Sequence, residues 1–187
     1  PITTATSRFG GVGTAGAEFG RTVVALGKHA SVHSFFNIAV GEPLGAGGAG
    51  GVWTIGLRDD GEVSFEQFIS GPQDSPYAAL DGECGTSLAS FDAWPRLVVG
   101  CPAFNGSRGA VHIITMTNAG RFSSSSAFKH SRNDSSELTF TVPLAPGVSF
   151  GESVAAVGDV DGDGYSDVAV GSSQSIYIIF LRSNAQP

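Results

Sequence analysis

The sequence has few charged residues and very few lysines. Asp, Glu, Lys and Arg together make up 14% of the 187 residues, where about 25% is usual in globular proteins. Lys28 and Lys129 are the only lysines, and the formal net charge is −7. A chain without clustered Lys and Arg lacks the basic patch that binds nucleic acid or an anionic membrane surface. We therefore expect no nucleic-acid partner.

Long apolar runs and helical patterns are also missing. No apolar run reaches the roughly 18 residues that a transmembrane helix needs, and no stretch combines a convincing helical period with capping residues. The sequence instead contains 27 glycines and 41% hydrophobic residues, which is enough apolar content to form a core. Short alternating apolar runs between glycine-rich turns predict a turn-rich, all-β protein.

Three segments of the chain share one pattern. Gly20, Gly85 and Gly151 each precede a short alternating run, and they are 65 and 66 residues apart. A second run ends in glycine at residues 38–41, 97–100 and 168–171, and a third follows at 51–55, 109–114 and 176–180. Weaker outer strands are expected near residues 63–69 and near 126–131 or 137–142. Four short strands in each unit of roughly 40–65 residues predict a β-propeller blade.

The residues that open and close these units resemble a known family. The dipeptides Phe19-Gly20 and Phe150-Gly151, two Val-Gly-x-Pro sequences and an Asp-rich turn resemble FG-GAP repeats, as in the propeller head of integrin α-subunits. The resemblance covers nearly the whole chain. It implies about three FG-GAP blades of four antiparallel strands, at residues 19–83, 84–149 and 150–187, the last of which binds calcium.

The two ends of the chain bear on how a ring of blades would close. The third unit has three clear strands, whereas residues 1–7 form a predicted strand without a blade, within an outer strand and loop at 1–18. We expect this N-terminal strand to complete the last blade. Propellers typically have four to eight blades, so we expect either a homodimer that closes a six-bladed ring or a fragment of a longer propeller chain. The start at Pro1 rather than Met predicts a mature or excised segment.

The strongest chemical signal is the sequence Asp-Val-Asp-Gly-Asp-Gly-Tyr-Ser-Asp at residues 159–167. Oxygen ligands at positions 1, 3, 5, 7 and 9 of a loop suit Ca²⁺. The predicted ligands are the carboxylates of Asp159, Asp161, Asp163 and Asp167 and the main-chain carbonyl of Tyr165. Position 12 is Val170 rather than Glu, which indicates a strand-loop-strand calcium turn and not an EF-hand. The alternative is an acidic Asp-Gly hairpin turn that needs no metal.

The corresponding loops of the other two units lack this set of ligands. In the first unit, His29, Ser31, His33 and Asn37 lie near the ligand positions, and no carboxylate is present. In the second unit the loop is shortened to residues 91–96. We therefore expect one Ca²⁺ per chain.

The chain contains two cysteines, Cys84 and Cys101. In the predicted hairpin of the second unit, Cys84 begins the first strand and Cys101 ends the second, so the two side chains lie opposite each other. The Cβ–Cβ distance between opposite residues of a hairpin is slightly longer than in a disulfide, and a small adjustment allows the bond. Two buried free thiols are the alternative. Asn105 and Asn133 each begin a glycosylation sequence. Together these features predict an extracellular protein, secreted or part of a cell-surface ectodomain.

Signals for catalysis are weak. Residues 11–16 and 45–50 match the glycine pattern of dinucleotide-binding loops, but neither links a parallel strand to a helix, and no nucleophile-elbow sequence is present. We predict no enzymatic activity. The resemblance implies a calcium-binding extracellular adhesion or interaction module that presents loops to a protein or glycan. The alternatives are a non-catalytic propeller appended to an extracellular hydrolase and a carbohydrate-binding propeller. The aromatic residues available for such a surface are Trp53, Tyr77, Phe91 and Trp94.

Overall fold

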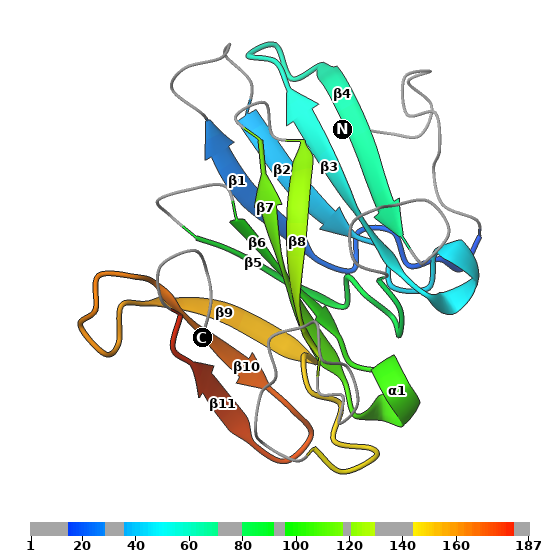
Figure 1. The fold of residues 1–187 in the computed structure, drawn as a ribbon. Helices are drawn as coiled ribbons and strands as arrows, with labels where there is room; N and C mark the ends of the chain where they lie inside the picture. The colour runs from blue at the N-terminus through cyan, green and yellow to red at the C-terminus, as the bar shows by residue number, and fades with distance from the viewer. Residues whose placement is uncertain are drawn as a thin grey trace.

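The computed structural model describes residues 15–28, 36–70, 80–91, 96–117, 121–129 and 144–181. Within these ranges the protein is all-β. Eleven strands form three antiparallel sheets, and helix is limited to two short turns, η1 (Ala46–Gly48) and α1 (Phe104–Ser107) (Figure 1). None of the described helices is long and apolar enough to cross a lipid bilayer.

The three sheets, named blades 1 to 3 here, follow one another along the chain. Blade 1 has the strand order β1 (Val23–Lys28), β2 (Phe36–Gly41), β3 (Gly51–Leu57) and β4 (Val63–Ser70). Blade 2 has the order β5 (Ser87–Ser90), β6 (Arg96–Cys101), β7 (Ala110–Met116) and β8 (Phe122–Lys129). Blade 3 has the order β9 (Ser153–Gly158), β10 (Asp167–Gly171) and β11 (Ile176–Ile179). These sheets are what the sequence pattern predicts for propeller blades.

The structure differs from the prediction at the outer strand of blade 2 and does not describe the strand expected to complete blade 3. In blade 2 the outer strand β8 begins at Phe122, earlier than the expected 126–131, because its hairpin with β7 pairs Met116 with Phe122. The alternative position at 137–142 lies outside the described residues, as does the strand at 1–7 that we expect to complete blade 3.

Apolar side chains from neighbouring blades form the core, and blade 2 lies between the other two (Figure 1). Successive residues of a strand point to opposite faces of the sheet. On β6, Val99 therefore packs toward blade 1, against Ala39 and Val52, whereas Val98 packs toward blade 3, against Val168. Both faces of β6 and β7 are buried, which explains why most of their residues are apolar.

Each blade opens with the same tight turn. The glycines of the Phe-Gly or Cys-Gly dipeptides, Gly20, Gly85 and Gly151, have φ angles of 88°, 92° and 91°. Side chains other than glycine rarely adopt this left-handed conformation. The residues two positions earlier, Glu18, Glu83 and Ser149, also have positive φ, at 58°, 60° and 54°. The recurrence of one backbone shape explains why these glycines recur along the sequence.

Hydrogen bonds from residues just after the first two opening turns join one blade to the next. The Thr22 hydroxyl donates to the carbonyl of Gly85 at 3.0 Å, and the Ser87 hydroxyl donates to the carbonyl of Gly151 at 2.8 Å. Each donor lies two residues after the opening glycine of its own blade. The junctions also contain one parallel bridge each, Gly50 with Cys84 and Gly109 with Phe150. The second junction thus repeats the geometry of the first.

Candidate metal site

The Asp-rich segment forms the turn between β9 and β10. Residues 159–165 are exposed, and the glycines at 158, 162 and 164 have φ angles of 76°, 80° and 91°. Glycine allows these positive angles without steric cost, so the chain can fold back within a few residues. The turn ends at Asp167, the first residue of β10.

The Asp159 side chain stabilises this turn by accepting hydrogen bonds from the main chain of the loop. Its Oδ1 accepts hydrogen bonds from the main-chain N–H groups of Gly162 at 2.7 Å and Asp163 at 3.0 Å. Its Oδ2 accepts one from the N–H of Gly164 at 2.8 Å. Aspartate commonly bonds to the backbone a few residues ahead in this way. The loop is therefore wrapped around one carboxylate.

Asp167 anchors the other end of the turn. Its side chain is fully buried, and its two oxygens accept hydrogen bonds from the N–H groups of Val160 at 2.8 Å and Leu181 at 2.9 Å. A register shift between Asp167 and Val168 in the β9–β10 pairing marks a bulge or irregularity, and bulges commonly redirect a side chain at a site. Asp167 thus ties the loop to the end of β11.

Three of the predicted ligands converge. One carboxylate oxygen from each of Asp159, Asp161 and Asp167 lies within 4.8 Å of the others. Oxygen ligands lie about 2.3–2.6 Å from Ca²⁺, so two ligands of one ion are at most about 5 Å apart. The spacing and the all-oxygen donors fit a hard cation of this size better than zinc, which favours nitrogen and sulfur.

The other two predicted ligands stay predictions. Asp163 is not part of the group of three, and its Oδ1 accepts a hydrogen bond from the N–H of Tyr165 at 2.9 Å. Tyr165 was expected to contribute its main-chain carbonyl, and its side chain is 40% exposed.

The carboxylates at this site have no basic partner in the described part of the chain. The two ion pairs found there, Arg21 with Glu18 and Arg58 with Glu62, both lie in blade 1. Like charges held this close destabilise each other when all are ionised. A bound divalent cation would offset that repulsion.

The equivalent loops of blades 1 and 2 do not assemble a comparable site from described residues. Asn37, which was expected near a ligand position, is a buried residue of β2, and Phe91 is buried at the end of the β5 segment. The predicted positions at His29, Ser31 and His33, and residues 92–95 of the second loop, lie outside the described residues.

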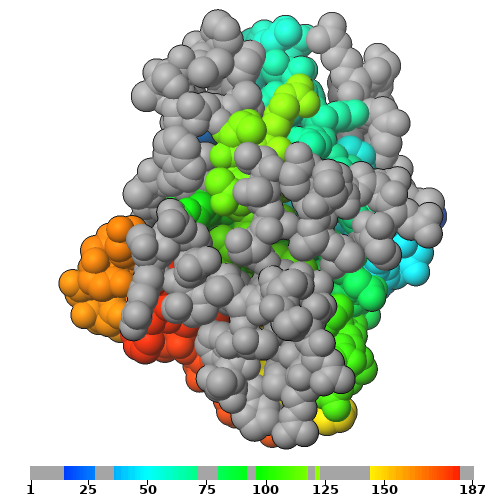
Figure 2. Space-filling model, viewed as in Figure 1, coloured from blue at the N-terminus to red at the C-terminus, as the bar shows by residue number. Residues whose placement is uncertain are grey.

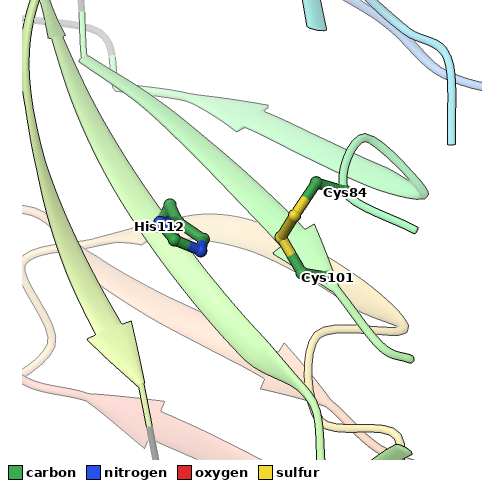
Figure 3. Close-up of side chains that lie close together, drawn as sticks. All are labelled: Cys84, Cys101 and His112. Atoms are coloured by element: carbon green, nitrogen blue, oxygen red, sulfur yellow. A yellow bond between two sulfur atoms is a disulfide. The ribbon is translucent and has the colours of Figure 1, made fainter. Parts of the chain in front are cut away.

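A second group of possible metal ligands, Cys84, Cys101 and His112, contains a disulfide. Cys84 and Cys101 form a disulfide with a Cα–Cα distance of 4.0 Å, so the predicted bond is confirmed and the free-thiol alternative is wrong. Cys84 was expected to begin the first strand of its unit, but it precedes β5 and forms an isolated bridge with Gly50. The ring of His112 on β7 lies beside the disulfide, and all three side chains are fully buried (Figure 3). Because the sulfurs are bonded to each other, they offer no thiolate ligand here.

One polar contact in the core was missed by the sequence analysis. Glu42 is buried and accepts a hydrogen bond from the indole N–H of Trp53, whose ring stacks on Phe68 at a centroid distance of 4.6 Å. The available signal was Glu42 itself, a charged residue in the Val-Gly-x-Pro closing sequence of the first unit. Trp53 and Phe91 are both buried, so neither contributes to an exposed aromatic surface.

Residues 150–180 match the family model of the FG-GAP repeat. The match spans all three strands of blade 3 and the whole Asp-rich turn. The chain therefore carries an FG-GAP repeat where its sequence resembles that family most strongly, and the all-β sheets around it agree with a propeller-type module.

Proposed function

We propose that this protein is a calcium-binding, non-catalytic interaction module of an extracellular protein, in which the ion has a structural role. The observation that carries the proposal is the convergence of the Asp159, Asp161 and Asp167 carboxylates within 4.8 Å. Asp163 and the Tyr165 carbonyl are the further ligands of the proposed site. When bound, Ca²⁺ neutralises these groups and holds the β9–β10 turn in one shape, which stiffens the loop for contact with a partner.

Several features support an adhesion or interaction role. The match to the FG-GAP repeat relates blade 3 to the propeller heads that the sequence resembles, and the disulfide between Cys84 and Cys101 is typical of proteins from oxidising compartments. The partner that we propose is a protein or glycan contacted by loops. A propeller appended to an extracellular hydrolase is the second candidate. A carbohydrate-binding propeller is the third candidate, and its sugar site would not involve Trp53 or Phe91, which are both buried; Tyr77 and Trp94 lie outside the described residues.

Calorimetric titration with Ca²⁺ tests the metal site. Extracellular calcium modules bind with dissociation constants on the order of 10⁻⁴–10⁻³ M, and we expect one site in this range with much weaker binding of Mg²⁺. Asp161→Asn removes one charge from the cluster and should weaken binding about tenfold or more. Asp81→Asn makes the same chemical change at an exposed residue of another loop and should leave binding unchanged. Equal affinities of the two variants would refute the assignment.

Adhesion is tested separately with the full chain on a glycan array and on a panel of extracellular-matrix proteins. Binding that disappears with a calcium chelator, and that Asp161→Asn weakens while Asp81→Asn does not, supports the interaction role. Absence of binding to every member of both panels in saturating Ca²⁺ contradicts it. Calcium binding by calorimetry with no partner would leave the metal site standing and remove the adhesion role.

A further inference from the structure

The loop between β6 and β7 contains a left-handed turn. Asn105, Gly106 and Ser107, which belong to α1, have φ angles of 50°, 68° and 58°. Residues other than glycine adopt this conformation at a cost in energy, and usually one residue at a time. Asn105 and Gly106 are exposed, and a Cβ added at Gly106 would meet no atom within 4 Å. Packing around Gly106 therefore does not explain the conformation.

Blade 1 contains the same turn in its equivalent loop. Residues 46–48, which form η1, have φ angles of 49°, 74° and 96°. In blade 1 the N–H of Gly50 donates to the carbonyl of Gly45 at 3.0 Å. In blade 2 the N–H of Gly109 donates to the carbonyl of Phe104, also at 3.0 Å. The two loops therefore share one backbone shape and differ in their side chains.

The comparison shows what the side chains of blade 2 add. Blade 1 has Gly48 at the third position of the turn, where glycine adopts a positive φ without steric cost. Blade 2 has Ser107 there, although serine at a positive φ costs conformational energy. Within the described part of the chain, no hydrogen bond of the Asn105 amide or the Ser107 hydroxyl is found. The turn thus forms without these two side chains, which with Gly106 make up an Asn-x-Ser acceptor sequence.

Contacts on both sides hold this turn in place. The N–H of Ala103 donates to the carbonyl of Gly82 at 3.0 Å, in the segment that leads into blade 2. The N–H of Ser149 donates to the carbonyl of Ser107 at 2.8 Å, from the opening turn of blade 3. A strained backbone persists only where its surroundings fix it, and such strain is concentrated at functional sites. Asn105 is therefore presented to solvent in one fixed backbone conformation.

The turn lies far from the Asp-rich loop. α1 follows the end of β6 and lies beside the opening turn of blade 3, where Gly109 forms a bridge with Phe150. The Asp-rich turn instead follows the other end of β9. The two segments lie on opposite sides of the molecule (Figure 1), and both reach the surface in the space-filling view, α1 in green and the Asp-rich turn in orange (Figure 2). A bulky group attached to α1 would leave the proposed calcium site uncovered.

We propose that Asn105 carries an N-linked glycan. In the transfer, the Asn105 Nδ2 forms a bond to the anomeric carbon of the first sugar of a lipid-linked oligosaccharide. The bond from that carbon to the diphosphate of the lipid breaks, the lipid diphosphate leaves, and the amide gives one proton to a base of the transferase. Glycans attached to such sequences are bulky and lie on the protein surface, and the exposure of Asn105 meets this requirement.

This inference rests on the extracellular location proposed above. N-linked glycans are added in the secretory pathway, whose oxidising conditions also favour disulfides such as that between Cys84 and Cys101. The second acceptor sequence of the chain, which begins at Asn133, lies outside the described residues. The structure therefore supports a glycan at Asn105 independently of any at Asn133.

The test uses the full chain, expressed with a secretion signal in a cultured animal cell line. Peptide mass spectrometry before and after an amidase that removes N-linked glycans, leaving Asp in place of Asn, locates each glycan. We expect a glycan at Asn105 in most secreted chains. Asn105→Asp and Ser107→Ala should each abolish it, and circular dichroism checks that both variants are folded. The matched control is Ser135→Ala, which makes the same change in the second acceptor sequence and should keep the glycan at Asn105.

The glycan should not disturb the folded protein. The urea midpoint and the Ca²⁺ affinity are expected to be the same before and after amidase treatment, because Asn105 is exposed and lies away from the Asp-rich turn. Ser107→Ala carried through the same treatment is the control for effects of the amidase itself. A glycosylated chain with a lower urea midpoint than the treated chain would contradict the open surface around Asn105.

Folded, secreted chains in which Asn105 is unmodified, or in which only Asn133 carries a glycan, would overturn the proposal. The secretion signal delivers the chain to the transferase whatever its natural location. An unmodified Asn105 would therefore refute the acceptor site and leave the proposed location standing. Calorimetry on the same samples reports calcium binding, so failure of the glycan and failure of the metal site give separate results.

Discussion

Replacement of Gly100 by alanine should weaken the junction between blades 2 and 3. A Cβ at this position would lie 2.0 Å from the carbonyl oxygen of Gly151 and 2.2 Å from the hydroxyl of Ser87. The hydroxyl can rotate away, but the carbonyl is part of the backbone of blade 3. To reach ordinary contact, the two blades must separate by about 1 Å or more, since real Cβ contacts begin above 3.0 Å.

The magnitude follows from the contacts that this separation disturbs. Overpacking of a filled contact costs about 1–3 kcal/mol. Loss of the 2.8 Å hydrogen bond from Ser87 to Gly151 adds about 1 kcal/mol. We expect Gly100→Ala to lower the free energy of unfolding by about 2–4 kcal/mol, which is a large part of the usual total of about 5–15 kcal/mol.

Gly171→Ala is the matched control, because its Cβ would meet the Ser153 hydroxyl at 2.1 Å but no carbonyl of a following blade. Urea unfolding followed by circular dichroism gives the two free energies. We expect about 1 kcal/mol or less for Gly171→Ala. Equal losses for the two variants would refute the idea that the carbonyl contact between blades requires glycine.

Three further effects are expected. Replacing Cys84 and Cys101 together by alanine should cost about 3 kcal/mol, the loop-closure value for a separation of 17 residues, and reductant should then have no further effect on urea unfolding. Glu42→Ala leaves the buried Trp53 N–H without its acceptor and should cost about 2–3 kcal/mol, whereas Glu42→Gln, which keeps a carbonyl oxygen, should cost less. Chelation from 10 mM Ca²⁺ should lower the free energy of unfolding by about 1–3 kcal/mol, and the Asp161→Asn variant should lose clearly less in the same thermal scan.

Much of the local structure was predictable because it depends on neighbours in the sequence. The Asp159 carboxylate accepts hydrogen bonds from residues 162–164, only a few positions ahead, so the pattern of aspartate and glycine predicted both the turn and its acidic interior. The short apolar runs that end in glycine similarly predicted β2, β6 and β10, because a strand buried on both faces is apolar along its length.

Contacts between residues far apart in the sequence were decided by the tertiary structure alone. Asp167 is buried because the N–H of Leu181 reaches it from the end of β11, and nothing near Asp167 in the sequence signals this. The local sequence also does not signal the close approach of the Gly151 carbonyl to Gly100. Nor does it signal the hydrogen bond from the Trp53 indole to Glu42. The sequence by itself determined the strands, the acidic turn and the recurring glycines. Only the packing of blades decided which apolar faces are covered, because burial depends on how distant segments meet in space.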